Sequence, residues 1–173
     1  MLVAAAVLAA CGGGAATPTS GPSPAATVSE STVAPAPSTL DTGDVEGFEI
    51  TTITVGDRSL TVAVADTPAR RAQGLMGVRD LGDLDGMLFV FDRVRPVAFW
   101  MKDTLIPLRV GYFDAQGVLF QVERMEPCPG DDCPTYPSSG DVRWALEIPA
   151  DRDFPPLGSV LSVPDARGNR PSR

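Results

Sequence analysis

The segment Trp100-Met101-Lys102-Asp103-Thr104 places an aromatic ring, an amine, a carboxylate and a hydroxyl close together. Lys102 is the only lysine of the chain, whereas the other 13 of its 14 basic residues are arginine. A lysine amine is a compact charge whose pKa changes readily on burial, so Lys102 could contact an anionic ligand or act as a tuned amine. The alternative is a surface lysine whose stem packs over Trp100. Asp103 and Thr104 either join this site or form a turn held by local side-chain hydrogen bonds.

Other charged residues could complete such a site. Glu147 lies within an apolar stretch, where an inward carboxylate needs a partner such as Arg71 or Lys102 and an outward one needs only solvent. Asp66 and Arg71 could form an acid–base pair, although Asp66 could equally cap a helix. The sequence therefore predicts a ligand-binding site that uses Trp100, Lys102, Asp103, Thr104, Arg71 and Glu147.

Several kinds of chemistry are absent from the sequence. The chain has no histidine, which excludes histidine-based acid–base catalysis, Ser-His-Asp hydrolysis and histidine-ligated metals. It also has no nucleophile-elbow, Walker or dinucleotide-binding motif. Met76, Met87 and Met101 could bind Cu(I) as soft ligands, but methionine is also a common core filler. We identify no catalytic residues, expect no metal or cofactor, and leave open whether the chain is an enzyme.

Cys128 and Cys133 flank the turn-forming tetrapeptide Pro129-Gly130-Asp131-Asp132. Such a turn can bring two Cα atoms within the ~4.4–6.8 Å that a disulfide requires. A metal site would need about four ligands, and two thiolates without histidine fall short. The sequence therefore predicts a disulfide, which fits an oxidising compartment.

The N-terminal segment predicts where the protein works. Leu8-Ala9-Ala10-Cys11 ends a short apolar run and resembles the lipobox of bacterial lipoproteins, whose cysteine carries a diacylglyceryl group after cleavage before it. The run is too short to span a bilayer as a helix, which takes roughly 20 residues. We interpret residues 1–10 as a signal remnant and Cys11 as the lipidation site. The expected location is extracytoplasmic, anchored to the bacterial membrane.

The rest of the chain divides by composition. Of the 34 residues from 12 to 45, 27 are Gly, Ala, Pro, Ser or Thr, so residues 11–45 are predicted to be the lipidated cysteine and a disordered stalk. Residues 46–165 form one predicted globular domain, and residues 166–173 a disordered basic tail. The domain has 11 basic and 19 acidic residues, which disfavours nucleic acid as a partner. A small molecule or an envelope protein is the expected partner.

Short strands and one early helix must position the candidate residues. Asp66-Thr67-Pro68 predicts the start of a helix over residues 68–75, with Gly74 and Gly77 at its end. Alternation and turn residues predict strands, of which 87–91 is buried on both faces, and a loop over 126–141. The predicted strands are 48–55, 60–65, 87–91, 97–101, 109–114, 118–123, 143–148 and 160–163. This pattern predicts a compact α+β domain whose curled sheet forms a small barrel or sandwich.

Several motifs in order resemble domain-of-unknown-function family 192, over residues 53–163. They are Gly74-Leu75-Met76-Gly77, Gly86-Met87-Leu88-Phe89, Phe99 to Thr104, Pro107-Leu108 and Leu146-Glu147-Ile148. The resemblance implies a compact β-rich fold in a small, often exported or lipid-anchored protein, and it implies no activity. Family members usually have Pro-Leu-Asp where this chain has Pro107-Leu108-Arg109, and Gly-Asp where it has Gly158-Ser159. A role for either aspartate is therefore not carried over.

We therefore expect a membrane-anchored extracytoplasmic binding or accessory module. One alternative is a carboxylate-dependent envelope enzyme that uses Asp66, Asp103 or Glu147 as acid or base, with Tyr112 or Tyr136 as further candidates. The other is a structural domain that docks on an envelope protein through an exposed apolar patch.

Overall fold

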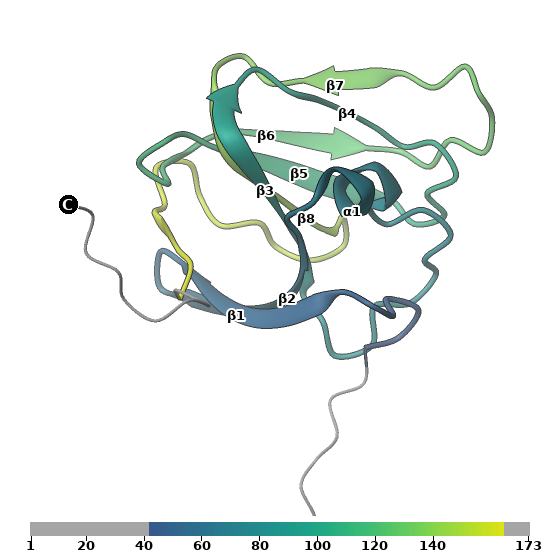
Figure 1. Cartoon of the computed structure of the whole chain (residues 1–173), viewed down its shortest axis with the longest axis horizontal. Coiled ribbons are helices and arrows are strands. Elements are labelled where there is room, and N and C mark those ends of the chain that lie inside the picture. Colours follow the sequence, from purple (N-terminus) through teal and green to yellow (C-terminus); the bar gives the residue numbers. More distant parts are fainter. Residues whose placement is uncertain (1–41, 165–173) are drawn as a thin grey trace, which may run out of the picture. The chain divides into compact units, whose positions relative to one another are not determined.

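Figure 1 shows the computed structural model of the chain, which describes residues 42–164. These residues belong to the second of two units, residues 38–173; the first unit, residues 1–37, lies outside the described residues. The predicted lipidation site at Cys11, the stalk up to residue 41 and the tail at 166–173 also lie outside them. The folded domain begins earlier than predicted, because Val45 is 3% exposed and packs in the core.

The described residues form short strands and one helix of six residues. The elements in chain order are β1 (Glu49–Val55), β2 (Arg58–Ala65), α1 (Pro68–Gln73), β3 (Gly86–Arg95), β4 (Ala98–Trp100), β5 (Leu108–Phe113), β6 (Leu119–Met125), β7 (Thr135–Pro137), β8 (Val142–Pro149) and β9 (Leu161–Ser162). Within residues 42–164, no helix has the length and apolar character needed to cross a membrane.

One curled, half-barrel sheet contains seven of the strands in the order β6-β5-β8-β3-β2-β1-β9, and β4 pairs separately with β7 (Figure 1). β2 and β3 are parallel, and the chain crosses between them through α1. Such a pair needs a crossover connection, which the segment around α1 provides. The other neighbouring strands are antiparallel. The predicted α+β class with a curled sheet and one early helix is confirmed.

Both faces of the sheet are covered by apolar side chains. On β3, Met87, Phe89 and Phe91 belong to one buried cluster, whereas Leu88 belongs to the other. The prediction that residues 87–91 are buried on both faces is therefore confirmed for these four positions. The first cluster also contains Leu75, just after α1, and Met101, just after β4, so these segments cover that face.

The helix is shorter than predicted and has a different cap. Thr67, not Asp66, is the N-cap, and its hydroxyl accepts a hydrogen bond from the Arg70 backbone N–H at 3.2 Å. Pro68 occupies the first turn, where its missing N–H costs nothing. Gly74 ends the helix at a φ of 49°, and its N–H donates to the Arg70 carbonyl at 2.9 Å. This left-handed φ suits glycine and stops the helix before Leu75.

The predicted loop over residues 126–141 contains the strand β7, which corrects that prediction. β7 pairs antiparallel with β4 through the Phe99–Tyr136 partners. The Tyr112 hydroxyl, on β5, donates to the Tyr136 carbonyl at 2.6 Å and ties this small ribbon to the main sheet. Burial raises the pKa of Tyr112 far above its usual value, so this tyrosine acts as a structural hydrogen-bond donor.

Candidate functional site

Glu147 is an acidic residue in an apolar row at the centre of the sheet. On β8 it lies opposite Met87 of β3 and Val110 of β5, and both neighbours are completely buried. Its own side chain is 4% exposed, on the face covered by α1 and β4. The inward of the two predicted orientations is therefore correct.

The Glu147 carboxyl has no ionic or hydrogen-bonding partner among the described residues. Neither Arg71 nor Lys102, the predicted partners, pairs with it. Burial raises its pKa to about 8, because removal from water disfavours the charged form. At neutral pH the group is therefore mainly a neutral carboxylic acid, which can donate one hydrogen bond and accept another.

A small recess leads from the surface to this carboxyl group. Among the described residues, every side-chain polar atom that is fully shielded from solvent has a hydrogen-bond partner. The Glu147 oxygens have no partner, so they are not fully shielded and reach the solvent-accessible space of the recess. Its volume of about 30 Å³ is enough for one or two water molecules. We call it the Glu147 recess, and its lining is Arg71, Ala72, Gln73, Gly74, Leu75, Met76, Phe89, Phe99, Trp100, Thr104 and Glu147.

Aromatic rings form one wall of the recess. Phe89 and Phe99 meet edge to face with ring centroids 4.9 Å apart, which fixes both rings. Trp100 is 46% exposed, so its indole lies at the rim. Besides Glu147, the recess has a second buried polar residue, Thr104, which is 5% exposed. An uncharged polar group held between aromatic surfaces fits this lining.

Arg71 lines the recess but is held in place by other groups. One of its guanidinium nitrogens, Nη1, donates to the carbonyl oxygens of Asp66 and Val90, both at 2.7 Å. Its Nη2 lies 3.7 Å from the exposed carboxylate of Asp92. The predicted Asp66–Arg71 side-chain pair is wrong, because the Asp66 carboxylate pairs with Arg70 at 3.0 Å.

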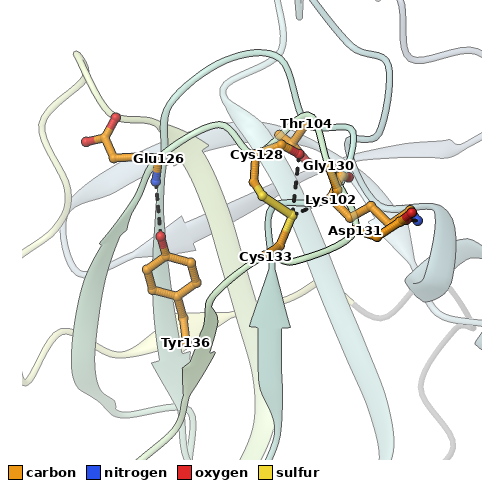
Figure 2. The surroundings of a disulfide bond; sticks show 8 residues. All are labelled: Lys102, Thr104, Glu126, Cys128, Gly130, Asp131, Cys133 and Tyr136. Carbon is orange, nitrogen blue, oxygen red and sulfur yellow. Dashed lines mark hydrogen bonds and ion pairs between the residues drawn. A yellow bond between two sulfur atoms is a disulfide. The ribbon is translucent and has the colours of Figure 1, made fainter.

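Lys102 and Asp103 lie beside the recess and not among its lining residues. The Lys102 ammonium pairs with Asp131 in the disulfide loop (Figure 2) and stands 5.8 Å from the Trp100 ring centroid. The hydrogen bond and charge of Asp131 raise the pKa of Lys102. Asp103 has a φ of 53°, and its N–H donates to the Cys128 carbonyl at 3.0 Å. Aspartate tolerates this left-handed conformation. Of the two predicted roles of Asp103, a site residue or a turn residue, the structure therefore shows the turn.

The predicted disulfide between Cys128 and Cys133 is present, with Cα atoms 5.8 Å apart (Figure 2). It closes a loop that carries Asp131, the partner of Lys102. Lys102 and Cys128 also form an isolated parallel bridge between the two segments. The disulfide loop therefore supports the turn that places Thr104 in the recess.

A second, wider hollow adjoins the Glu147 recess. It has a volume of about 150 Å³ and shares Arg71, Phe89, Phe99 and Trp100 with the recess. Its remaining lining residues are Phe91, Arg95, Val97 and Ala98, and we call it the outer hollow. The guanidinium groups of Arg71 and Arg95 lie 5.5 and 5.7 Å from the Phe91 ring centroid. Stacking of both guanidinium groups on the Phe91 ring therefore keeps two positive charges in the outer hollow.

Comparison with known proteins identifies the family. The family model for domain-of-unknown-function family 192, described as "Uncharacterized ACR", matches residues 51–152. The chain belongs to family 192. The match covers every lining residue of the recess and of the outer hollow. No curated protein matches the chain.

Two solved structures resemble this family 192 chain. A Sinorhizobium meliloti protein, provisionally described as a transcription regulator, has a TM-score of 0.60 and 29% identity over 70% of this chain and 98% of that chain. A protein of unknown function from Novosphingobium aromaticivorans has a TM-score of 0.58 and 25% identity over 70% and 91%. Both are similar to this chain over nearly their whole length, which supports the fold.

The departure from the family 192 pattern at Arg109 lies outside the recess. The Arg109 guanidinium donates to the Arg152 carbonyl at 3.1 Å. Gly74, Phe89, Phe99 and Arg95 are among the lining residues that the sequence did not assign to the site. The first three lie in the quoted family motifs, so the motifs carried that signal. Arg95 ends β3 between two of the quoted motifs and belongs to neither of them, so it had no comparable signal.

Proposed function

We propose that this family 192 chain is a binding module for a small organic molecule, one polar end of which enters the Glu147 recess. The observation that carries the proposal is a buried carboxyl without a partner among the described residues, open to an aromatic-lined recess. The recess has room for one or two water molecules beside the carboxyl oxygens. A ligand group that made the same hydrogen bonds could replace such water.

We further propose that the module is a lipoprotein held outside the cytoplasm by a lipid on Cys11. The lipobox-like sequence and the composition of residues 12–45 support this location. The disulfide between Cys128 and Cys133 supports it independently, because such bonds persist mainly in oxidising compartments.

DNA binding, as the description of the Sinorhizobium protein would suggest, is disfavoured for this chain. Residues 42–164 contain 11 basic and 19 acidic residues, and phosphate contacts depend on an excess of basic ones. The binding proposal therefore concerns a small ligand.

A carboxylate-dependent envelope enzyme is the second candidate, favoured by the pKa of about 8 at Glu147, which suits a general acid near neutral pH. The two-carboxylate form of this hypothesis lacks support, since Asp66 and Asp103 do not line the recess. A docking domain is the third candidate, and the exposed side chains of Trp100 and Leu105 would be its contact points.

A ligand screen observed by nuclear magnetic resonance tests the binding proposal. Compounds that shift the Trp100 indole signal of the wild type should bind at least several-fold more weakly to Trp100→Ala and to Glu147→Leu, which removes both hydrogen-bonding oxygens. Binding to each variant is followed through the backbone amides of residues 102–104. Two controls should bind like the wild type. Leu157→Ala removes an apolar side chain that is 64% exposed and lines neither hollow. Glu123→Gln removes a carboxylate from the same row of the sheet, on β6.

The outcome that contradicts the proposal is equally clear. If both site variants bind every hit as tightly as the controls do, the recess is not the binding site. Turnover of a bound compound that is lost in Glu147→Gln would instead favour the enzyme.

A further inference from the structure

The Glu147 recess and the outer hollow share four lining residues, so the two hollows adjoin. Their polar groups differ in charge. The recess ends at a neutral acid and the Thr104 hydroxyl, whereas the outer hollow holds the guanidinium groups of Arg71 and Arg95. A ligand that fits both would need two chemically different ends.

The inner end suits an uncharged group. Glu147 lies between Met87 and Val110, and no described basic group offsets a negative charge there. An ammonium group would have to ionise Glu147 in surroundings that disfavour its charge. A carbonyl or hydroxyl oxygen can accept from the neutral acid without any charge. The Thr104 hydroxyl donates its proton to the Lys102 carbonyl at 3.4 Å, so it can only accept, from a hydroxyl or amide N–H of the ligand.

The outer end suits an anion. No described carboxylate pairs with Arg95, whose guanidinium stacks on the buried ring of Phe91. Arg71 is only weakly offset, since Asp92 is exposed and 3.7 Å away. A planar guanidinium pairs well with a carboxylate, and the stacking restricts its freedom beforehand.

We propose that the ligand of this chain is a small organic carboxylate with an uncharged carbonyl or hydroxyl end, the polar end in the Glu147 recess and the carboxylate on Arg95. This inference rests on the proposed binding function. It names the class of ligand, for which acylated amino acids are the simplest examples.

Three probes of nearly equal size test the charge preference. N-acetylglycinate carries the carboxylate, N-acetylglycinamide is its neutral match, and N-acetylethylenediamine carries an ammonium group. At low ionic strength the wild type should bind the anion up to about fivefold more tightly than the neutral probe, as expected for one exposed ion pair. The cationic probe should bind most weakly. Affinities come from titrations of the Trp100 indole signal.

Two arginine variants locate the preference. Arg95→Gln should lose the preference for the anion, so that it binds the anionic and neutral probes about equally. Arg93→Gln removes the same charge from the same strand and lines neither hollow, so it should keep the preference. An anion preference that survives Arg95→Gln, or tighter binding of the cation, would overturn the inference.

Failure of the inference and failure of the proposed function give different results. If the three probes shift the Trp100 signal equally, the recess binds ligands and only the carboxylate assignment is wrong. If no probe shifts any signal of the recess but compounds from the screen do, the ligand class is wrong and the binding function stands. If neither the probes nor the screened compounds shift these signals, both are wrong.

Discussion

At the scale of single residues, the state of Glu147 determines how the domain responds to pH. Its carboxyl is buried between apolar side chains, so the folded protein holds its proton up to a pKa of about 8, against 4.5 for an ordinary glutamate. Between these two values the unfolded chain has released the proton while the folded chain keeps it. Ionisation therefore works against folding in this range.

The first prediction follows from the sign of this shift. The contribution of Glu147 to stability should be fully present below pH 4.5 and lost as the pH rises through about 8. In Glu147→Gln that loss should be absent, so above pH 8 the variant should exceed the wild type in free energy of unfolding by an amount on the order of a few kcal/mol. Urea unfolding across this pH range measures the difference.

Glu123→Gln is the control, since Glu123 lies on the same row of the sheet but at its outer strand. Its stability should change with pH as in the wild type. Parallel curves for the wild type and Glu147→Gln would show that the buried carboxyl ionises normally.

At the scale of elements, the sequence predicted most strands because their hydrophobic runs are long or alternate. It missed β7 because Thr135–Pro137 has only three residues and ends in proline, which offers no alternation to read. It left the direction of Glu147 open for a different reason. β8 is apolar on both sides of the sheet, so its alternation does not reveal which face the carboxyl takes.

Packing of one strand against another was equally invisible in the sequence. Gly86 begins β3 where a Cβ atom would lie 1.9 Å from the Glu147 carbonyl oxygen. Only glycine allows this approach of the two backbones, which sets the position of β8 beside β3. The motif that contains Gly86 indicated the family. The physical reason for a glycine at this position is the contact with β8, about 60 residues away in the chain.

The disulfide loop yields the second prediction. The double variant Cys128→Ser/Cys133→Ser should lower the free energy of unfolding by roughly 2 kcal/mol, because closing a short loop restricts the unfolded chain. Since the Cys128 carbonyl accepts from Asp103, the amides of residues 102–104 should also become less protected from hydrogen exchange. Reduced wild-type protein should behave like the double variant. Equal stability of the oxidised and reduced forms would contradict this prediction.

At the scale of the whole molecule, charge and proposed anchoring act together. The described domain has an excess of eight acidic residues, so an anionic membrane surface would repel it. A lipid on Cys11 with residues 12–41 as a tether would keep the domain close to the membrane without contact. Ligands would then reach the recess from the surrounding solvent.

The third prediction concerns this anchor. Expressed from its own gene in its native host, the mature protein should begin at Cys11 and carry diacylglycerol on the thiol, because stable anchoring takes more than one acyl chain. Mass spectrometry of the N-terminal peptide measures this. Cys11→Ser should move the protein from the membrane to the soluble fraction, and Ser20→Ala should not. An unmodified Cys11 at the membrane would contradict the lipoprotein assignment.

The two tryptophans of the chain lie on opposite faces of the sheet. Trp100 stands at the rim of the recess, whereas Trp144 packs against the other core cluster. In the variant Trp144→Phe, tryptophan fluorescence would therefore come from Trp100 alone. Its emission wavelength and intensity would report whether the recess is filled. The domain thus carries an optical reporter for its own ligand, and no label has to be attached.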